Sequence, residues 1–208
     1  MIPIVSRSLL VAALAAAAGA ALTACAPIIV GTAVVGTAMV ATDRRTTGIQ
    51  LEDEVIQGKA KSRVQEALGD RGQLVVTTYN RVVLLTGEVP DAADKAKAEQ
   101  AVKTVENVQS VVNEITIGFP RSVSQRSNDA YLTTKVKASL VDARDLLANS
   151  IKVETTGGVV YLMGLVTQRE ADRAADVARG VSGVQKVVKV FEVISEEEMA
   201  RIAPKTPS

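Results

Sequence analysis

The sequence contains no histidine, no tryptophan and only one cysteine among its 208 residues. Zinc sites are normally built from Cys and His ligands, and Ser-His-Asp triads and Cys-His dyads need an imidazole base. The composition therefore excludes those sites. Catalysis by paired carboxylates or by a Ser-Lys pair stays formally open, but no phosphate-binding loop of the GxxxxGK[ST] or GxGxxG type occurs. We predict a chain without catalytic residues, without a bound cofactor and without a metal site.

The chain also lacks an excess of either charge, with 24 basic residues against 23 acidic ones. Arg7 is the only charged residue among the first 24, so a chain that begins at residue 25 has 24 − 1 = 23 basic residues against 23 acidic ones. Binding to nucleic acid depends on a surplus of positive charge over the phosphates. We therefore exclude nucleic acid as a partner.

The lone cysteine follows an apolar segment in the sequence Leu22-Thr23-Ala24-Cys25. A short basic start, an apolar middle and small residues before the cut are typical of a secretory signal peptide, here residues 1–24. The four residues resemble the lipobox of bacterial lipoproteins. This resemblance implies cleavage before Cys25, diacylglycerol on its thiol and acylation of the new amino group, which together anchor a protein firmly. The alternative is a cleavage site that happens to precede a cysteine.

A second apolar stretch, residues 26–42, carries no charge and is about 17 residues long, at the lower limit of a membrane span. Its two glycines and its β-branched residues make it a poor helix in water. We predict that residues 25–50 form the lipidated cysteine and an apolar, flexible tether. A second membrane span is the alternative.

The rest of the chain is an internal duplication. Residues 82–89 (VVLLTGEV) pair with residues 159–166 (VVYLMGLV) at an offset of 77. Each copy shows helical periodicity, two short β-rich runs around a tight turn, a second helix and a last strand. We predict an α+β fold with two αββαβ domains, each a three-stranded mixed sheet covered on one face by two helices. The predicted ranges are domain 1 over 51–118, a linker over 119–127, domain 2 over 128–194 and a charged C-terminal tail over 195–208.

Two details of the duplication concern single residues. Val64 pairs with Val136 at an offset of 72, which predicts about five more residues between the first helix and the first strand of domain 2. Gly87 and Gly164 fall late in the second strands, where glycine permits a bulge or the close approach of a helix. We interpret both glycines as structural residues kept for packing.

Each unit, with its strand-Gly-x-Val and its later Val-x-x-Val-x-x-Val (Val105, Val108, Val111; Val181, Val184, Val187), resembles the BON domain. Two such units behind a lipobox resemble the dual-BON outer-membrane lipoproteins of Gram-negative bacteria. This resemblance implies a non-enzymatic protein on the periplasmic face of the outer membrane that supports envelope integrity. It also implies binding of anionic phospholipid through the first helix of domain 2.

That helix carries an outer face beside its core stripe, and this face is the candidate lipid site. Asp129, Asp142 and Asp145 nearly balance Lys135, Lys137 and Arg144, so we expect a local and modest attraction to anionic lipid. In the alternative interpretation, Tyr131 packs against the neighbouring domain, and Lys135 and Lys137 form a solvated face of the helix. Two rival functions stay open: a module that docks envelope or division proteins, and a chaperone-like periplasmic stress protein. The candidate site residues are Tyr131, Thr134, Lys135, Ala138 and Val141.

Overall fold

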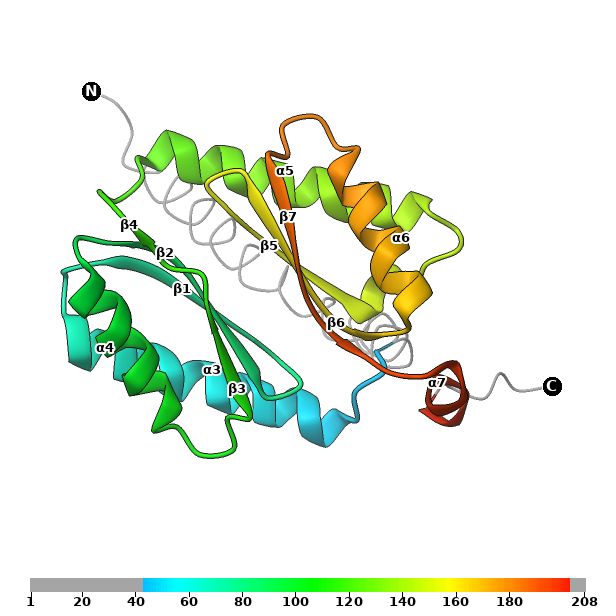
Figure 1. Ribbon diagram of the computed structural model, residues 1–208, viewed down its shortest axis with the longest axis horizontal. Coiled ribbons are helices and arrows are strands. Elements are labelled where there is room, and N and C mark those ends of the chain that lie inside the picture. Colours follow the sequence, from blue (N-terminus) through cyan, green and yellow to red (C-terminus); the bar gives the residue numbers. More distant parts are fainter. Residues whose placement is uncertain (1–42, 203–208) are drawn as a thin grey trace, which may run out of the picture. The chain divides into compact units, whose positions relative to one another are not determined.

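The computed structural model describes residues 43–202 (Figure 1). The predicted signal peptide, Cys25, most of the tether and the end of the tail lie outside these residues. Within 43–202 no helix is both long enough and apolar enough to cross a membrane. The elements of the first half are α3 (Thr47–Leu68), β1 (Gln73–Tyr79), β2 (Val82–Val89), α4 (Ala92–Lys103), β3 (Ser110–Asn113) and β4 (Thr116–Ile117); those of the second half are α5 (Val123–Asp142), η1 (Ala148–Ser150), β5 (Ile151–Thr156), β6 (Val159–Val166), α6 (Gln168–Arg179), β7 (Lys186–Val193) and α7 (Glu196–Ile202).

The two sheets have the same topology. β1 is antiparallel to β2 and β5 is antiparallel to β6, while β3, β4 and β7 run parallel to β2 or β6. The hairpin turns are Asn80-Arg81, with φ of 48° and 63°, and Gly157-Gly158, with φ of 59° and 75°. Two positive φ values in a two-residue loop match the twist of the flanking strands. The predicted pair of αββαβ units is therefore confirmed, with the third strand of domain 1 split into β3 and β4.

One face of each sheet is covered by its own two helices, as Figure 1 shows for α3 and α4 and for α5 and α6. On β2, Val83 and Leu85 point into this core with Ile56 and Ala98. The corresponding core of domain 2 includes Leu132, Val136, Leu162 and Ala174. Burial of such side chains is the main favourable term in folding.

The opposite faces of the two sheets form a third apolar cluster. Its buried members are Tyr79 and Leu84 from domain 1 and Tyr161 and Met163 from domain 2. At its edge the Thr156 hydroxyl donates to Thr86 Oγ1 at 3.0 Å. Alternate residues of β2 and β6 therefore serve two different cores, which explains why both strands are almost continuously buried.

Three segments predicted as tether, linker or tail are partly helical. α3 begins at Thr47 and α5 at Val123, rather than near residues 53 and 129, and residues 196–202 form α7. The early starts follow from N-caps, because the Thr46 side chain accepts from the Ile49 amide and Ser122 forms a capping box with Gln125. Residues 123–127 of the predicted linker 119–127 are therefore part of α5.

The pairing of Val64 with Val136 is wrong by one helical turn. Asp53 and Asp129 hold equivalent hairpins, and this equivalence aligns Ala60 with Val136 at an offset of 76. The loop of domain 2 is longer, with eight residues (143–150) against four (69–72). Between the aligned helices, at an offset of 76, and the aligned hairpins, at an offset of 77, domain 2 has only one additional residue rather than about five; the other extra loop residues come from the earlier end of α5 and the later start of β5. Part of the loop is the short helix η1.

Gly87 and Gly164 lie where another backbone segment comes very close. Gly87 has a φ of +112°, and an added Cβ would collide with the carbonyl oxygen of Gln73. At Gly164 the added Cβ would lie 2.7 Å from the Ser150 carbonyl oxygen. The close neighbour is thus the start of β1 for Gly87 and the last residue of η1 for Gly164.

Candidate functional site

The outer face of α5 lies opposite the side that packs into domain 2. Asp129, Leu132, Val136 and Leu140 are its buried residues. At 3.6 residues per turn, Thr134, Ala138, Tyr131 and Val141 fall within an arc of about 80° on the other side. All four are exposed, and Tyr131 and Val141 are each 65% exposed. Tyr131 therefore does not pack against domain 1.

Val123 extends this stripe by two further turns. It is 69% exposed and falls on the same side of the helix as Thr134 and Val141. The sequence reasoning missed it because Val123 falls within residues 119–127, which the sequence predicts as linker. The signal was present in the capping box Ser122-x-x-Gln125, which marks a helix that begins at Val123. We define the outer stripe as Val123, Tyr131, Thr134, Lys135, Ala138 and Val141.

Lys135 is the cation of the outer stripe. Its Nζ lies 5.7 Å from the centre of the Tyr131 ring and donates to the Ser182 carbonyl oxygen at 2.7 Å. Within residues 43–202 it forms no ion pair. Its full positive charge is thus available beside an exposed aromatic ring, a combination typical of side chains at a membrane surface.

The charge balance around α5 is more positive than the residue counts indicate. Asp129 is buried and paired with Arg121. Asp145 is paired with Arg173 at 2.9 Å, and the hydrogen bond from Arg173 lowers the pKa of its carboxyl. Asp145 is therefore neutralised by Arg173, while Asp129 shares Arg121 with Glu88, which lies 2.6 Å from the same guanidinium. Of the three acids, only Asp142 forms no ion pair within residues 43–202.

Domain 1 presents a different surface at the equivalent place. At an offset of 76, Val55 corresponds to Tyr131 and Lys59 to Lys135, and Val55 is 48% exposed. Lys59 pairs with Glu106 at 3.0 Å, whereas the equivalent of Glu106 in domain 2 is Ser182. The hydrogen bond from Lys59 lowers the pKa of Glu106. Domain 1 thus has neither the aromatic ring nor the free cation.

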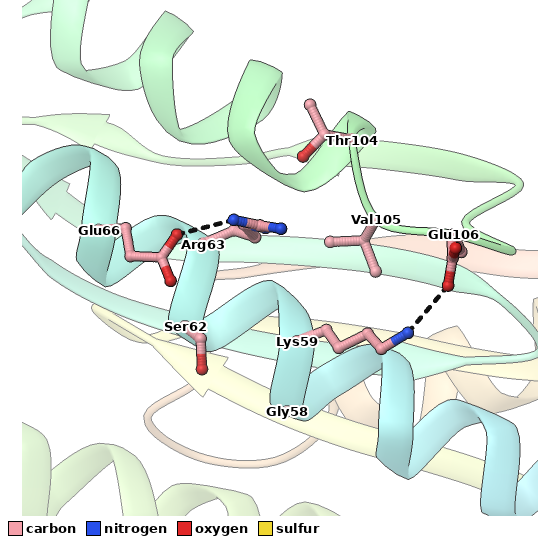
Figure 2. A pocket seen from close by; sticks show the side chains of 8 residues that line it. All are labelled: Gly58, Lys59, Ser62, Arg63, Glu66, Thr104, Val105 and Glu106. Atoms are coloured by element: carbon pink, nitrogen blue, oxygen red, sulfur yellow. Dashed lines mark hydrogen bonds and ion pairs between the residues drawn. The ribbon is translucent and has the colours of Figure 1, made fainter.

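Figure 2 shows the groove of about 600 Å³ that surrounds the Lys59–Glu106 pair, between α3 and the loop after α4. A second ion pair in it joins Arg63 to Glu66 at 2.9 Å. Both basic side chains of the groove are therefore matched by a carboxylate. This makes the groove a poor site for an anionic headgroup.

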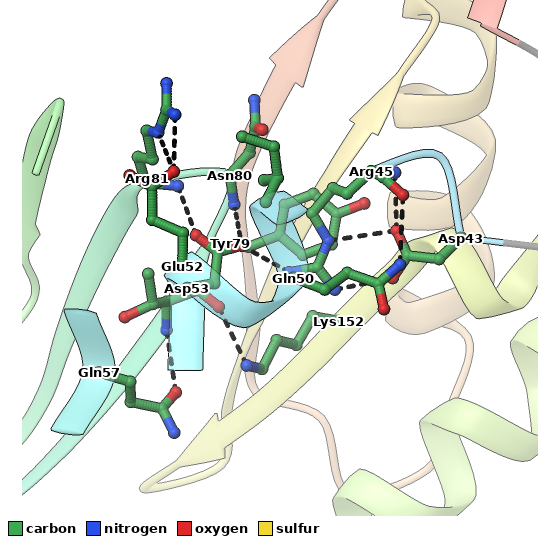
Figure 3. Close-up of polar contacts among 12 residues, drawn as sticks. Asp43, Arg45, Gln50, Glu52, Asp53, Gln57, Tyr79, Asn80, Arg81 and Lys152 are labelled. Atoms are coloured by element: carbon green, nitrogen blue, oxygen red, sulfur yellow. Dashed lines mark hydrogen bonds and ion pairs between the residues drawn. The ribbon is translucent and has the colours of Figure 1, made fainter. Parts of the chain in front are cut away.

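Each first helix is fixed by an aspartate that caps the hairpin turn of its own domain (Figure 3 for domain 1). Asp53 accepts from the backbone amides of Asn80 and Arg81, both at 2.7 Å, and pairs with Arg45. Asp129 accepts from the amides of Gly157 and Gly158 at 3.0 and 2.9 Å and pairs with Arg121. The sequence reasoning missed both pairs, although Arg45-x₇-Asp53 and Arg121-x₇-Asp129 repeat the same spacing.

Polar contacts also cross the cluster between the sheets. The Tyr79 hydroxyl donates to the Ser150 carbonyl oxygen at 3.1 Å, and Lys152 Nζ donates to the Thr78 carbonyl oxygen at 3.0 Å. Burial raises the pKa of Tyr79 to about 12 and lowers that of Lys152. These side chains hold the two domains together and leave the outer stripe of α5 free.

Nothing in the described part of the chain suggests a metal centre, since no group of three or more acidic or cysteine side chains within 43–202 is arranged to hold an ion. The polar clusters described above consist of ion pairs and caps that satisfy one another. The exposed outer stripe of α5 is therefore the candidate functional site.

The comparisons with known proteins agree with this architecture. The chain is 42% identical to "Outer membrane lipoprotein DolP" of Haemophilus influenzae over 74% of this chain and 80% of that protein. It is 34% identical to "21 kDa hemolysin" of Actinobacillus pleuropneumoniae over 73% and 79% of the two chains. It is 33% identical to "Osmotically-inducible protein Y" of Escherichia coli over 66% and 70%. The BON domain family matches residues 52–118 and 128–195. The chain therefore belongs to the BON domain family and carries two copies of the domain.

Proposed function

We propose that this protein is a non-enzymatic lipoprotein of the outer membrane that faces the periplasm, supports envelope integrity and binds anionic phospholipid through the outer stripe of α5. The relative named an outer membrane lipoprotein supports the location, and the lipobox supports anchoring through Cys25. The observation that carries the binding site is the outer stripe itself. Its other five residues are exposed and uncharged, and its one cation, Lys135, has no carboxylate partner within residues 43–202.

The stripe suits a shallow position in the headgroup region. The Tyr131 ring and the Val123 and Val141 side chains supply apolar surface, and the phenolic hydroxyl can stay hydrated. Lys135 and Lys137 would lie near lipid phosphates, and each basic residue near an anionic surface contributes about 1 kcal/mol. The acyl chains on Cys25 already hold the protein at the membrane. The role of α5 is then to select where on that membrane the protein binds.

The test uses the mature chain with Cys25→Ser, which cannot be acylated, titrated with vesicles of phosphatidylglycerol and phosphatidylethanolamine. We expect Tyr131→Glu to reduce binding at least about tenfold, because it places an anion where apolar surface should meet anionic lipid. Val55→Glu is the matched control, since it makes the same change at the equivalent position of α3. It should bind like the parent chain.

Two outcomes contradict the proposal. If Val55→Glu weakens binding as much as Tyr131→Glu, the surface that contacts lipid is not specific to domain 2. If neither variant changes binding, while an envelope protein is still captured after loss of Tyr131 and Lys135, the rival role as a protein-interaction module takes its place. Vesicles of phosphatidylcholine alone separate the contribution of charge from that of apolar contact.

A further inference from the structure

Arg44 stands at the end of the tether, just before domain 1, yet its side chain binds domain 2. Its guanidinium donates to both carboxylate oxygens of Glu170, at 2.6 and 2.8 Å, and to the Leu165 carbonyl oxygen at 2.8 Å. The Arg44 and Glu170 side chains are only 7% and 10% exposed. A buried bidentate arginine–carboxylate pair is among the strongest and most directional polar contacts in proteins.

The next residue, Arg45, binds domain 1 instead. It pairs with Asp53 at 2.6 Å, and its guanidinium lies 4.0 Å from the centre of the Tyr79 ring. Asp43 pairs with the same arginine at 2.7 Å (Figure 3). Two successive residues are therefore held by two different domains. Because a single peptide bond joins them, the backbone at residues 44–45 is held to both domains at once.

The carboxylate on domain 2 is itself held in place. Glu170 is the third residue of α6, and it accepts from the Thr167 amide at 3.0 Å in a capping box. Burial alone would raise its pKa, but the hydrogen bonds from Arg44 and from the Thr167 amide outweigh this and lower it. The Leu165 carbonyl lies at the end of β6. The arginine thus enters a site that is formed by rigid elements of domain 2.

We propose that the corner of Leu165 and Glu170 is a docking site for the end of the tether, and that residues 43–45 form a clasp across the two domains. The clasp makes domain 2 the place where the tether leaves the folded unit. The domain that carries the outer stripe would then also fix the direction of the lipid anchor. This proposal concerns the tether and does not depend on whether α5 binds lipid.

Trypsin cleavage after Arg44 and Arg45 reports directly on the clasp. In the mature Cys25→Ser chain we expect slow cleavage at both positions. Glu170→Gln removes the charge that holds Arg44, but glutamine can still accept from the Thr167 amide, so α6 keeps its cap. We expect cleavage after Arg45 to become about tenfold faster or more, because local opening governs proteolysis. Cleavage after Arg63, within α3, should not change.

Asp145→Asn is the matched control, because it removes one carboxylate from an exposed ion pair of the same domain. It should leave cleavage after Arg45 unchanged. Arg44→Gln and the double variant Arg44→Gln/Glu170→Gln complete a double-mutant cycle. Cleavage after Arg45 should be no faster in the double variant than in either single variant. Unchanged cleavage after Arg45 in Glu170→Gln would overturn the proposal. Equal acceleration after Arg63 would also overturn it, since the domains would then be unfolding rather than releasing a clasp.

Discussion

Neighbouring leucines on β2 should have different roles, and this can be tested with two equal substitutions. Leu84 and Leu85 are both fully buried. Leu85 belongs to the core between sheet and helices of domain 1, and Leu84 to the cluster between the two sheets. A buried Leu→Ala change costs about 2–5 kcal/mol in either place. In Leu85→Ala this loss falls on domain 1 itself, which is a large part of the typical 5–15 kcal/mol of a domain.

In Leu84→Ala the same loss falls on the contact between domains. We expect each domain to stay folded while the pair opens more easily, so that thermal unfolding separates into two transitions. Leu85→Ala should instead unfold domain 1 at a lower temperature.

The tyrosines provide the second readout, because Tyr79 and Tyr161 lie in the cluster that Leu84 joins. Burial raises the pKa of each to about 12, from an ordinary 10.0. In Leu84→Ala, tyrosinate absorbance should therefore develop at lower pH. If the two variants showed the same single transition and the same tyrosine titration, the division of β2 between two cores would be wrong.

Three further predictions concern single residues. Gly164→Val should lower the melting temperature by several degrees, since its Cβ would meet the Ser150 carbonyl, whereas Gly118→Val, in open space, should not; calorimetry that finds equal melting temperatures would contradict the packing role. Asp129→Ala should cost about 2–4 kcal/mol in urea unfolding, because it leaves two turn amides without an acceptor and removes one of the two carboxylates that pair with Arg121, the other being Glu88; a loss below 1 kcal/mol would refute this role. Burial raises the pKa of Glu154 above its ordinary 4.5, so with rising pH the unfolded chain releases this proton before the folded chain does. The free energy of unfolding should therefore fall as pH rises from 4.5 through the pKa of the folded state. Glu154→Gln should remove that fall and be more stable than the parent chain at pH 7, and urea titrations across this pH range that coincide for both chains would contradict it.

Local patterns in the sequence predict the order of elements, the hairpin turns and the two glycine positions. They are less reliable predictors of a side chain's contacts where the contacting residue lies far away in the sequence. Val83, Leu84 and Leu85 read as one apolar run, and nothing local shows that the middle residue faces another domain. Ala60 is as buried as Val64, but alanine is a weaker indication of a buried position than valine. An alignment of the first helices on their valines is therefore shifted by one turn.

The same limit applies to polar residues. Arg44 and Glu170 are 126 positions apart, so no spacing rule links them. Within α5, helical periodicity predicts the exposed side of Tyr131 and Val141 correctly. It does not predict that Asp129 and Asp145 are already paired, because their partners come from outside the helix. The available charge of the candidate site therefore depends on the tertiary structure.

The central claim is that the outer stripe of α5, and not its counterpart on α3, recognises anionic lipid. The most direct measurement is the affinity of the non-acylated chain for phosphatidylglycerol vesicles in the matched variants Tyr131→Glu and Val55→Glu. We predict a loss of at least about tenfold for the first and none for the second, because only domain 2 combines an exposed ring with an unpaired lysine. Equal affinities for the two variants would contradict the account.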